Sequence, residues 1–180
     1  LWDHLRKERS ELEAFRPTPL SCPEVQAEGF VQPYSDSPLD EERVGETVYL
    51  NLISKAEKYV YITTPYLIIG NEMVTALENA AKSGVDVRII TPHIPDKWYV
   101  HAVSRAHYQP LIEAGVRIYE YTPGFIHAKG FLVDGEYATV GSVNMDYRSL
   151  YLHFECGVWM YRTPCIADIH RDFMETLAAS

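Results

Sequence analysis

Two side chains with complementary chemistry lie two residues apart in the second half of the chain. His127 and Lys129 alternate with Ala128 and Gly130 in a run that continues through apolar residues to Val133. This run predicts a strand, and residues i and i+2 of a strand project from the same face. An imidazole can attack or donate a proton near neutral pH, and an ammonium can hold a phosphate oxygen as a point charge. The spacing therefore indicates a site for an anionic, phosphate-bearing substrate.

Neutral hydrogen-bond donors follow on the returning strand. The chain is predicted to turn at Asp134-Gly135 and to return as a second strand to Val140, after which Ser142 and Asn144 occur. This residue set suits two-step transfer at phosphorus, in which one imidazole attacks and a second protonates the leaving alcohol. The lysine, the serine and the amide would hold the non-bridging oxygens. Such a mechanism requires no metal, and we expect no cofactor.

These positions match a known signature, HxKxxxxD…GSxN, and through it the chain resembles the phospholipase D superfamily. A single histidine on a strand is more often a packing residue than a catalytic one. A match at six positions in the right order favours the catalytic interpretation, in which the matching residues are His127, Lys129, Asp134, Gly141, Ser142 and Asn144.

The motif occurs once in the chain. No other histidine is followed two residues later by a lysine. A two-histidine reaction therefore needs a second imidazole from elsewhere. We expect it either from a second copy of the chain, by homodimerisation, or from another segment of a longer protein.

Acidic residues near the motif allow more than one interpretation. Glu155 either accepts a hydrogen bond from the far nitrogen of an active-site imidazole, which it would orient, or is an edge-strand carboxylate in solvent. Asp134 belongs to the catalytic signature, but at a turn it is expected to hold the hairpin by local hydrogen bonds. Asp146 and Arg148 are expected to form an ion pair or to cap a bend.

Strands and helices alternate along the chain, which predicts an α/β fold with a mixed sheet sandwiched between helices. A charged helix is expected over residues 1–16 and a proline-containing linker over residues 17–28. The predicted strands span residues 29–34, 59–64, 85–91, 116–121, 126–133, 135–140 and 154–161, and the predicted helices span residues 37–58, 71–83, 97–114 and 163–177.

Individual residues predict where these elements begin and end. The first strand is expected to end at Pro33, and Ser37 and Asn71 are expected to cap the helices that follow them. The helix over residues 97–114 is expected to be irregular near Pro110. Glycines at the ends of two helices, Gly84 and Gly115, are expected to terminate them.

Composition limits the function further. The chain contains 16 Lys and Arg residues and 25 Asp and Glu residues. The resulting net charge of −9 argues against a general nucleic-acid binder. No apolar run approaches the roughly 20 residues needed to cross a bilayer, so we expect this piece to be soluble. No His, Cys or Asp cluster has zinc spacing. The three cysteines, Cys22, Cys156 and Cys165, lack CxxC spacing and are expected to be free thiols.

Stretches outside the motif narrow the resemblance to the C-terminal half of bacterial cardiolipin synthases of the phospholipase D type. The likeness covers roughly residues 29–175, including 29–34, 61–67, 84–90, 119–129 and 146–155. It implies a site between two similar α/β/α lobes, each with one motif. It also implies transfer of a phosphatidyl group from one phosphatidylglycerol to another, with release of glycerol.

The same resemblance implies roles and context. His127 would be one of two catalytic histidines, and Lys129 and Asn144 would bind phosphate. Residues 1–28 would be the connection from an N-terminal lobe of the same polypeptide, and residues 29–180 the second catalytic lobe. The full-length protein would lie at the bacterial cell membrane, anchored by N-terminal segments that this chain lacks, and the isolated chain is expected to be inactive.

Two other functions are consistent with the residues. The chain could be a homodimeric phosphodiesterase or nuclease with one motif per subunit, which sedimentation would reveal as a stable dimer. It could also be a non-catalytic phosphate-binding module, which failure of vanadate to bind near His127 would favour.

Overall fold

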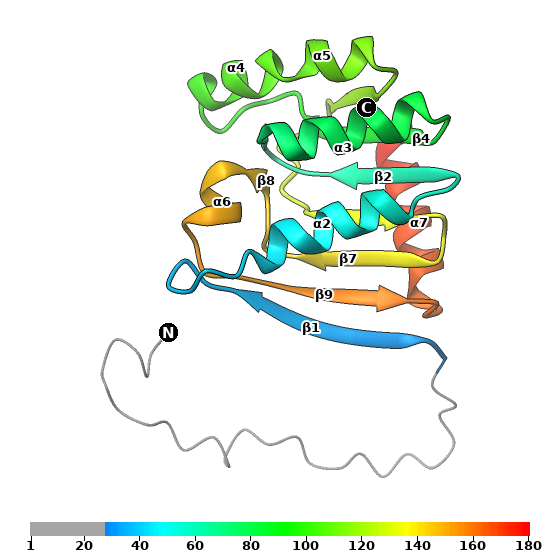
Figure 1. Ribbon diagram of the computed structural model, residues 1–180. Helices are drawn as coiled ribbons and strands as arrows, with labels where there is room; N and C mark the ends of the chain where they lie inside the picture. The colour runs from blue at the N-terminus through cyan, green and yellow to red at the C-terminus, as the bar shows by residue number, and fades with distance from the viewer. Residues whose placement is uncertain (1–27) are drawn as a thin grey trace.

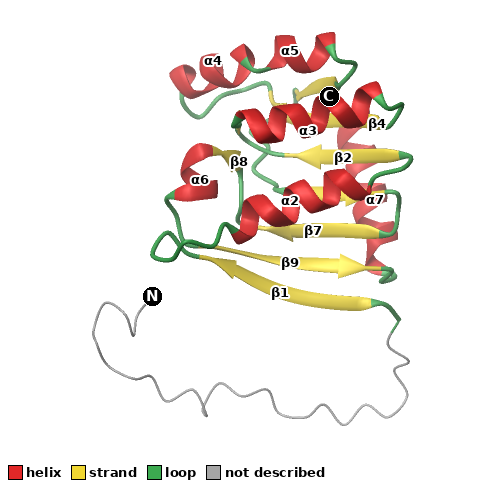
Figure 2. Ribbon diagram, viewed as in Figure 1, coloured by secondary structure: helices red, strands yellow, loops and turns green. Residues whose placement is uncertain are grey.

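The computed structural model describes residues 28–180, which form a seven-stranded mixed sheet with helices on both faces (Figures 1 and 2). The charged helix and most of the linker expected before residue 28 lie outside this range. The strands are β1 (Phe30–Asp36), β2 (Tyr59–Thr63), β3 (Leu67–Ile68), β4 (Asp86–Pro92), β5 (Arg117–Tyr121), β6 (Gly130–Val133), β7 (Tyr137–Gly141), β8 (Met145–Asp146) and β9 (Glu155–Tyr161). The helices are α2 (Val44–Lys55), α3 (Asn71–Lys82), α4 (Trp98–Ala106), α5 (Tyr108–Glu113), α6 (Tyr147–Tyr151) and α7 (Cys165–Ala178).

The sheet has a parallel half and an antiparallel half, in the order β1-β9-β7-β6-β2-β4-β5. Strands β2, β4 and β5 are parallel, as expected where helices connect successive strands. From β6 onward the neighbours β6, β7, β9 and β1 run antiparallel. The two halves join where β6 pairs with β2. The predicted mixed sheet between helices is confirmed.

Alternate residues along each central strand enter different cores. Val60 and Ile62 of β2 pack into the larger cluster, which α2 and α3 cover, whereas Tyr61 packs beneath α7 on the other face. Strand β6 follows the same rule, with Phe131 in the first cluster and Leu132 in the second. The period of two thus assigns side chains to faces, and Figure 1 shows α2 and α3 on one side of the sheet with α7 on the other.

Two predicted boundaries near the first strand were wrong. Strand β1 passes through Pro33 and continues to Asp36, which is possible because β1 is an edge strand paired only with β9. Helix α2 begins at Val44 rather than after Ser37. The carboxylate of Asp36 accepts hydrogen bonds from the N–H of Ser37 (3.0 Å) and of Gly45 (2.7 Å), so it closes the first turn of α2 from outside the helix.

Other boundaries differ in detail. Asn71 is the first residue of α3, and the N-cap position belongs to Gly70. The predicted helix over residues 97–114 is divided into α4 and α5 at His107, because Pro110 cannot donate a hydrogen bond to the preceding turn. Gly84 and Gly115 have φ values of 94° and 103°, which confirms the two predicted helix ends.

A small second sheet and a short helix were not predicted. Strand β3 pairs with β8 in parallel, joining segments about 80 residues apart in sequence, and α6 follows β8 directly. Leu67 and Met145 of this sheet are buried in the larger core. These elements matter for function because β8 and α6 form the segment that follows Ser142 and Asn144.

Candidate active site

The signature residues, apart from Asp134, gather at one edge of the sheet, where the parallel strands β2, β4 and β5 end. His127 and Lys129 lie between the end of β5 and the start of β6, and Ser142 follows the end of β7. Gly130 pairs with Thr63 at the end of β2, and Gly141 pairs with Gly157 at the same level of the sheet. Open α/β sheets commonly bind ligands at the carboxyl ends of their parallel strands.

His127 and Lys129 lie just before β6 rather than within a strand. The predicted strand over residues 126–133 is confirmed only for Gly130–Val133. The reason is that β2, one neighbour of β6, ends at Thr63 and is followed by Pro65, so residues before Gly130 have no strand partner on that side. The backbone of this segment is held at one point, where the N–H of Gly141 donates to the carbonyl of Lys129 (3.4 Å).

The imidazole of His127 is exposed and bordered by aromatic rings. The Phe125 ring lies 5.5 Å from it between centroids, and the Tyr66 ring meets it edge-on at 6.4 Å. Partial desolvation by these neighbours lowers the pKa of His127 below its ordinary value of 6.5, and the charge of Lys129 lowers it further. The shift favours the neutral imidazole, the form in which one ring nitrogen is unprotonated.

Lys129 is a cation with unused hydrogen-bonding capacity. Its Nζ donates to the carbonyl oxygen of His127 at 2.6 Å, which leaves two further N–H groups available. Desolvation lowers the pKa of Lys129, while the carboxylates of Glu155 and Asp146 act in the opposite direction. Two acidic side chains thus lie near the ammonium without forming a direct ion pair with it, and an anion could reach the ammonium.

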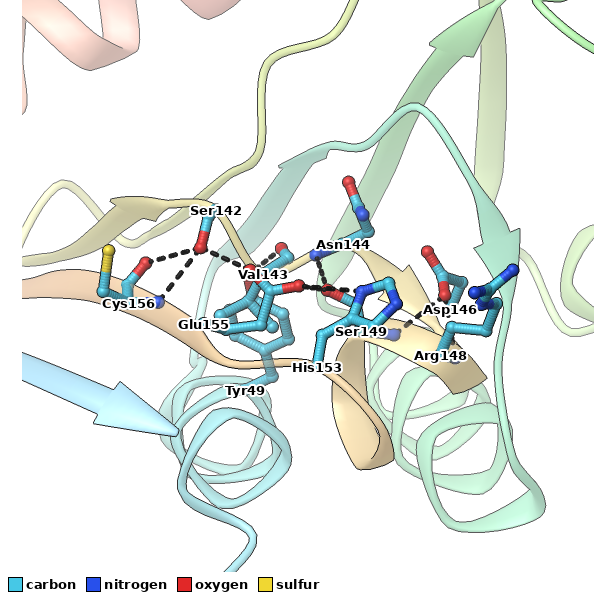
Figure 3. A network of polar contacts seen from close by, with 10 residues as sticks. All are labelled: Tyr49, Ser142, Val143, Asn144, Asp146, Arg148, Ser149, His153, Glu155 and Cys156. Carbon is cyan, nitrogen blue, oxygen red and sulfur yellow. Dashed lines mark hydrogen bonds and ion pairs between the residues drawn. The ribbon is translucent and has the colours of Figure 1, made fainter. Parts of the chain in front are cut away.

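The side chain of Glu155 is buried and organises a network of hydroxyl groups (Figure 3). Its side chain is only 7% exposed. One carboxylate oxygen accepts the hydroxyl hydrogen of Ser142, and the other accepts that of Ser149 at 2.5 Å. The Nδ1 atom of His153 lies 3.6 Å from the second oxygen. The interpretation of Glu155 as a solvated edge-strand carboxylate is wrong. Its side chain is buried, and its strand, β9, is not an edge strand because it lies between β1 and β7.

The same network determines what Ser142 and Asn144 can do. Ser142 uses its single hydroxyl hydrogen on Glu155 and accepts the N–H of Cys156 at 3.0 Å. Asn144 is anchored through its backbone N–H, which donates to Ser149 Oγ (2.8 Å). Its buried Oδ1 atom has no partner among the described residues. The amide is therefore not fully hydrogen-bonded among the described residues, and its Nδ2 group is a candidate donor for a ligand.

Asp134 lies at the opposite end of β6 from the rest of the signature. Its carboxylate accepts three backbone N–H groups, those of Glu57 (2.7 Å), Lys58 (2.9 Å) and Tyr59 (2.7 Å). The turn at Asp134-Gly135 is confirmed, with φ values of 55° and 72°. Local hydrogen bonds within the hairpin were predicted, but the observed ones join the hairpin to residues at the start of β2. This geometry indicates that the Asp134 carboxylate has a structural role.

The remaining polar residues are structural or were missed. Asp146 caps α6 by accepting the N–H groups of Arg148 (2.9 Å) and Ser149 (3.0 Å), as expected for a bend cap. Ser149 itself was not predicted, because its bond to Glu155 depends on the meeting of α6 with β9. Tyr66 was also missed, since its proximity to His127 arises between segments far apart in sequence.

The described residues also limit what else this edge can hold. Residues 28–180 contain no group of three or more His, Cys, Asp or Glu side chains that could hold a metal ion. Within the same range, no helix is both long and apolar enough to cross a bilayer. Cys156 and Cys165 are free thiols, as predicted, and Cys22 lies outside the described residues.

Comparisons with known proteins support the signature. Residues 49–177 match a family model described as the PLD-like domain of cardiolipin synthase. The chain is 39% identical over 174 residues to cardiolipin synthase from Geobacillus kaustophilus, which covers 97% of the chain and 34% of that relative. It is 56% identical over 157 residues to an uncharacterized protein from Streptococcus mutans, covering 87% of the chain and 34% of the relative. The chain thus spans about a third of the length of the curated relatives it matches.

Solved structures share the fold at low sequence identity. Nuc from Salmonella typhimurium, a phospholipase D family member, superimposes with a TM-score of 0.70 and 19% identity, covering 82% of this chain and 93% of that one. Phosphatidylserine synthase from Haemophilus influenzae gives a TM-score of 0.62 with 20% identity, covering 81% of this chain and 38% of that one.

Proposed function

The chain belongs to the family of phospholipase D-like domains of cardiolipin synthases, and we propose that it is one catalytic lobe of a phosphatidyltransferase. The proposed reaction makes cardiolipin from two phosphatidylglycerol molecules. The observation that carries the proposal is that the imidazole of His127, the ammonium of Lys129 and the amide of Asn144 belong to segments at the same end of strands β2, β6 and β7. These groups supply a nucleophile, a cation and a neutral donor for one phosphodiester.

The proposed chemistry is a double displacement at phosphorus. In the first step a neutral imidazole nitrogen bonds to phosphorus as the bond to the glycerol oxygen breaks, and a second imidazole gives its proton to the departing glycerol. In the second step that imidazole takes the proton of a hydroxyl on another phosphatidylglycerol. The hydroxyl oxygen then bonds to phosphorus, and the phosphorus–nitrogen bond breaks. The lowered pKa of His127 favours the attacking role, because the attacking nitrogen must be unprotonated.

Lys129 and Asn144 would stabilise charge on the non-bridging oxygens, which grows in the transition state. Ser142 would take part as a donor only after releasing Glu155, so its proposed contact with phosphate depends on a shift in that network. Glu155 is the proposed orienting group for an active-site imidazole. Within this chain its oxygens receive the hydroxyl groups of Ser142 and Ser149, and neither receives the ring of His127.

The second imidazole is proposed to come from an N-terminal lobe of a longer polypeptide. Support comes from the single motif in this chain and from relatives about three times its length. Residues 1–28 would connect the lobes, residues 29–180 would form the second lobe, and the whole protein would act at the bacterial cell membrane. The single motif also supports a second candidate, a homodimeric phosphodiesterase, which a stable dimer of this chain in sedimentation would favour.

Replacing His127 in the full-length protein tests the proposal. His127→Ala should abolish phosphatidyl transfer between phosphatidylglycerol molecules, because neither attack nor proton transfer can then occur at this position. His170→Ala is the matched control: that ring projects from α7 and stacks against Tyr61, so its loss should leave transfer in place. Near-normal transfer by His127→Ala would refute the assigned role. A phosphatidyl group trapped on residue 127 by a denaturant quench at mildly alkaline pH, which preserves the acid-labile phosphorus–nitrogen bond, would establish it as the nucleophile.

A further inference from the structure

Four large apolar side chains project into solvent at and just before helix α4. The exposed fractions are 49% for Ile94, 79% for Trp98, 53% for Tyr99 and 46% for Val103. We call these four residues the α4 surface. Scattered exposed apolar residues are common on proteins, but a group of this size that includes two aromatic rings usually marks an interaction site.

The α4 surface has no covering element among the described residues, because α4 packs through another side. Ser104 is buried, and its hydroxyl accepts the N–H of Leu67 on β3 at 3.2 Å. Tyr99 and Val103 are four residues apart and therefore lie on one face of the helix. The Trp98 ring meets the Tyr99 ring edge-on at 6.0 Å, so the two rings form a continuous patch.

The α4 surface adjoins the catalytic edge. Tyr66, whose ring lies against His127, donates its hydroxyl hydrogen to Asp96 at 2.7 Å, two residues before Trp98. The exposed Phe125 ring borders His127 on another side. Helix α4 also packs on β3, which pairs with β8 directly after Asn144. A body that touched the α4 surface would therefore lie within reach of the proposed phosphate site.

The charge of this region differs from that of the whole chain. Residues 93–107 contain one acidic residue, Asp96, together with Lys97, Arg105 and three of the seven histidines, whereas the chain carries a net charge of −9. Asp96 is engaged with the Tyr66 hydroxyl, and Arg105 pairs with Glu120. Lys97 therefore stands beside the two aromatic rings as a cation in an otherwise acidic protein, which complements an anionic surface.

We propose that the α4 surface docks on an anionic phospholipid bilayer, with Trp98 and Tyr99 in the headgroup region and Lys97 at the lipid phosphates. Aromatic rings with a polar edge favour this region, and a nearby lysine adds attraction to anionic lipid. Docking would bring the phosphodiester of a lipid to His127 without drawing the whole lipid into water. The inference rests on the proposed function for its lipid substrate.

Co-sedimentation with vesicles tests the docking. The 180-residue chain should bind mixed vesicles that contain equal amounts of phosphatidylglycerol and phosphatidylcholine. It should bind vesicles of phosphatidylcholine alone more weakly. Trp98→Ser with Tyr99→Ser should weaken binding to the mixed vesicles roughly ten-fold or more, through the apolar area lost. Lys97→Gln should weaken it roughly five-fold, with little effect on phosphatidylcholine alone.

Phe30→Ser is the matched control, because Phe30 is 69% exposed but lies on β1 at the other end of the sheet from β4 and β5. It should bind as the parent chain does. Circular dichroism would establish that all variants fold. Equal binding by the parent chain and the Trp98/Tyr99 variant, equal loss in Phe30→Ser, or no binding by the parent chain would each overturn the proposal. The proposal would also be overturned if the parent chain self-associates and the Trp98/Tyr99 substitutions abolish that self-association but leave vesicle binding unchanged.

The outcome is separable from the proposed function. His127→Ala should bind vesicles normally, since the imidazole is not part of the α4 surface. If vesicle binding depends on Trp98 and Tyr99 but the full-length protein transfers no phosphatidyl group, the proposed function fails and the docking stands. If transfer occurs in detergent and the Trp98/Tyr99 variant still binds vesicles normally, the docking alone fails.

Discussion

Gly141 and Gly157 face each other on strands β7 and β9 with no room for a β-carbon on either residue. A β-carbon on Gly141 would lie 2.3 Å from the carbonyl oxygen of Cys156, and one on Gly157 would lie 2.4 Å from the Tyr34 ring. Because Gly141 directly precedes Ser142, this close approach of two backbones determines where the serine enters the site. The glycine of the signature thus has a packing reason.

Gly141→Ala should lower the free energy of unfolding by about 1–3 kcal/mol, since the obstructing atoms belong to the backbone of β9 and cannot rotate away. Gly124→Ala is the matched control: nothing lies within 4 Å of its would-be β-carbon, and the change should stay within about 0.5 kcal/mol. Urea unfolding of both variants measures the difference. Equal stabilities would show that the strands can separate at no cost.

Ser149→Ala should destabilise the fold by about 1–3 kcal/mol, because it removes a donor to the buried Glu155 and the acceptor of the Asn144 N–H together. Ser54→Ala provides the comparison: that hydroxyl donates to a carbonyl of α2 in an exposed position, and its loss should cost less than about 0.5 kcal/mol. Thermal unfolding of the two variants would distinguish them. A Ser149→Ala protein as stable as Ser54→Ala would contradict the network drawn in Figure 3.

The His127 imidazole should titrate below 6.5 in an NMR experiment on this chain, because desolvation and Lys129 both disfavour its charged form. Lys129→Gln should raise that pKa without restoring the ordinary value, since desolvation remains. The unfolded chain binds this proton more tightly than the folded one. The free energy of unfolding contributed by His127 therefore rises with pH between the folded pKa and 6.5. A pKa above 6.5, or one unchanged by Lys129→Gln, would refute the assigned causes.

Asp134→Ala should cost about 2–4 kcal/mol of stability, because three backbone N–H groups lose their acceptor and alanine tolerates a positive φ poorly. Asp134→Asn should cost less, since asparagine accepts the same φ and keeps one carbonyl oxygen. If the proposed function is right, Asp134→Asn in the longer protein should retain phosphatidyl transfer at temperatures where it is folded. Loss of transfer by a folded Asp134→Asn protein would instead support the catalytic assignment.

The sequence predicted the elements better than their ends, for reasons visible in particular residues. Alternation of apolar residues places the strands, because it reports which face is buried. The start of α2 could not be predicted, since the carboxylate that closes its first turn lies nine residues before Gly45, on β1. The start of β6 was missed because it depends on where the neighbouring β2 ends. Both are properties of a partner segment.

The candidate site shows the same division. The pairing of His127 with Lys129 could be read from spacing, because both belong to one short segment. The buried position of Glu155 and its bonds to Ser142 and Ser149 required β7, β9 and α6 to meet. The contact of Tyr66 with His127 joins residues 61 positions apart, and no local pattern marks it.

The carboxylate of Asp134 has a consequence for the opposite end of its strand. Lys129 stands one residue before β6 and Asp134 one residue after it, so five residue steps, about 17 Å of extended chain, separate them. A slip of the hairpin by a single residue would exchange the faces of Lys129 and Ala128, and the cation would turn away from its target. The three hydrogen bonds that the Asp134 carboxylate accepts from backbone N–H groups at the start of β2 oppose such a slip. The orientation of the ammonium thus depends on a distant carboxylate, which lies at the opposite end of the strand from the candidate site.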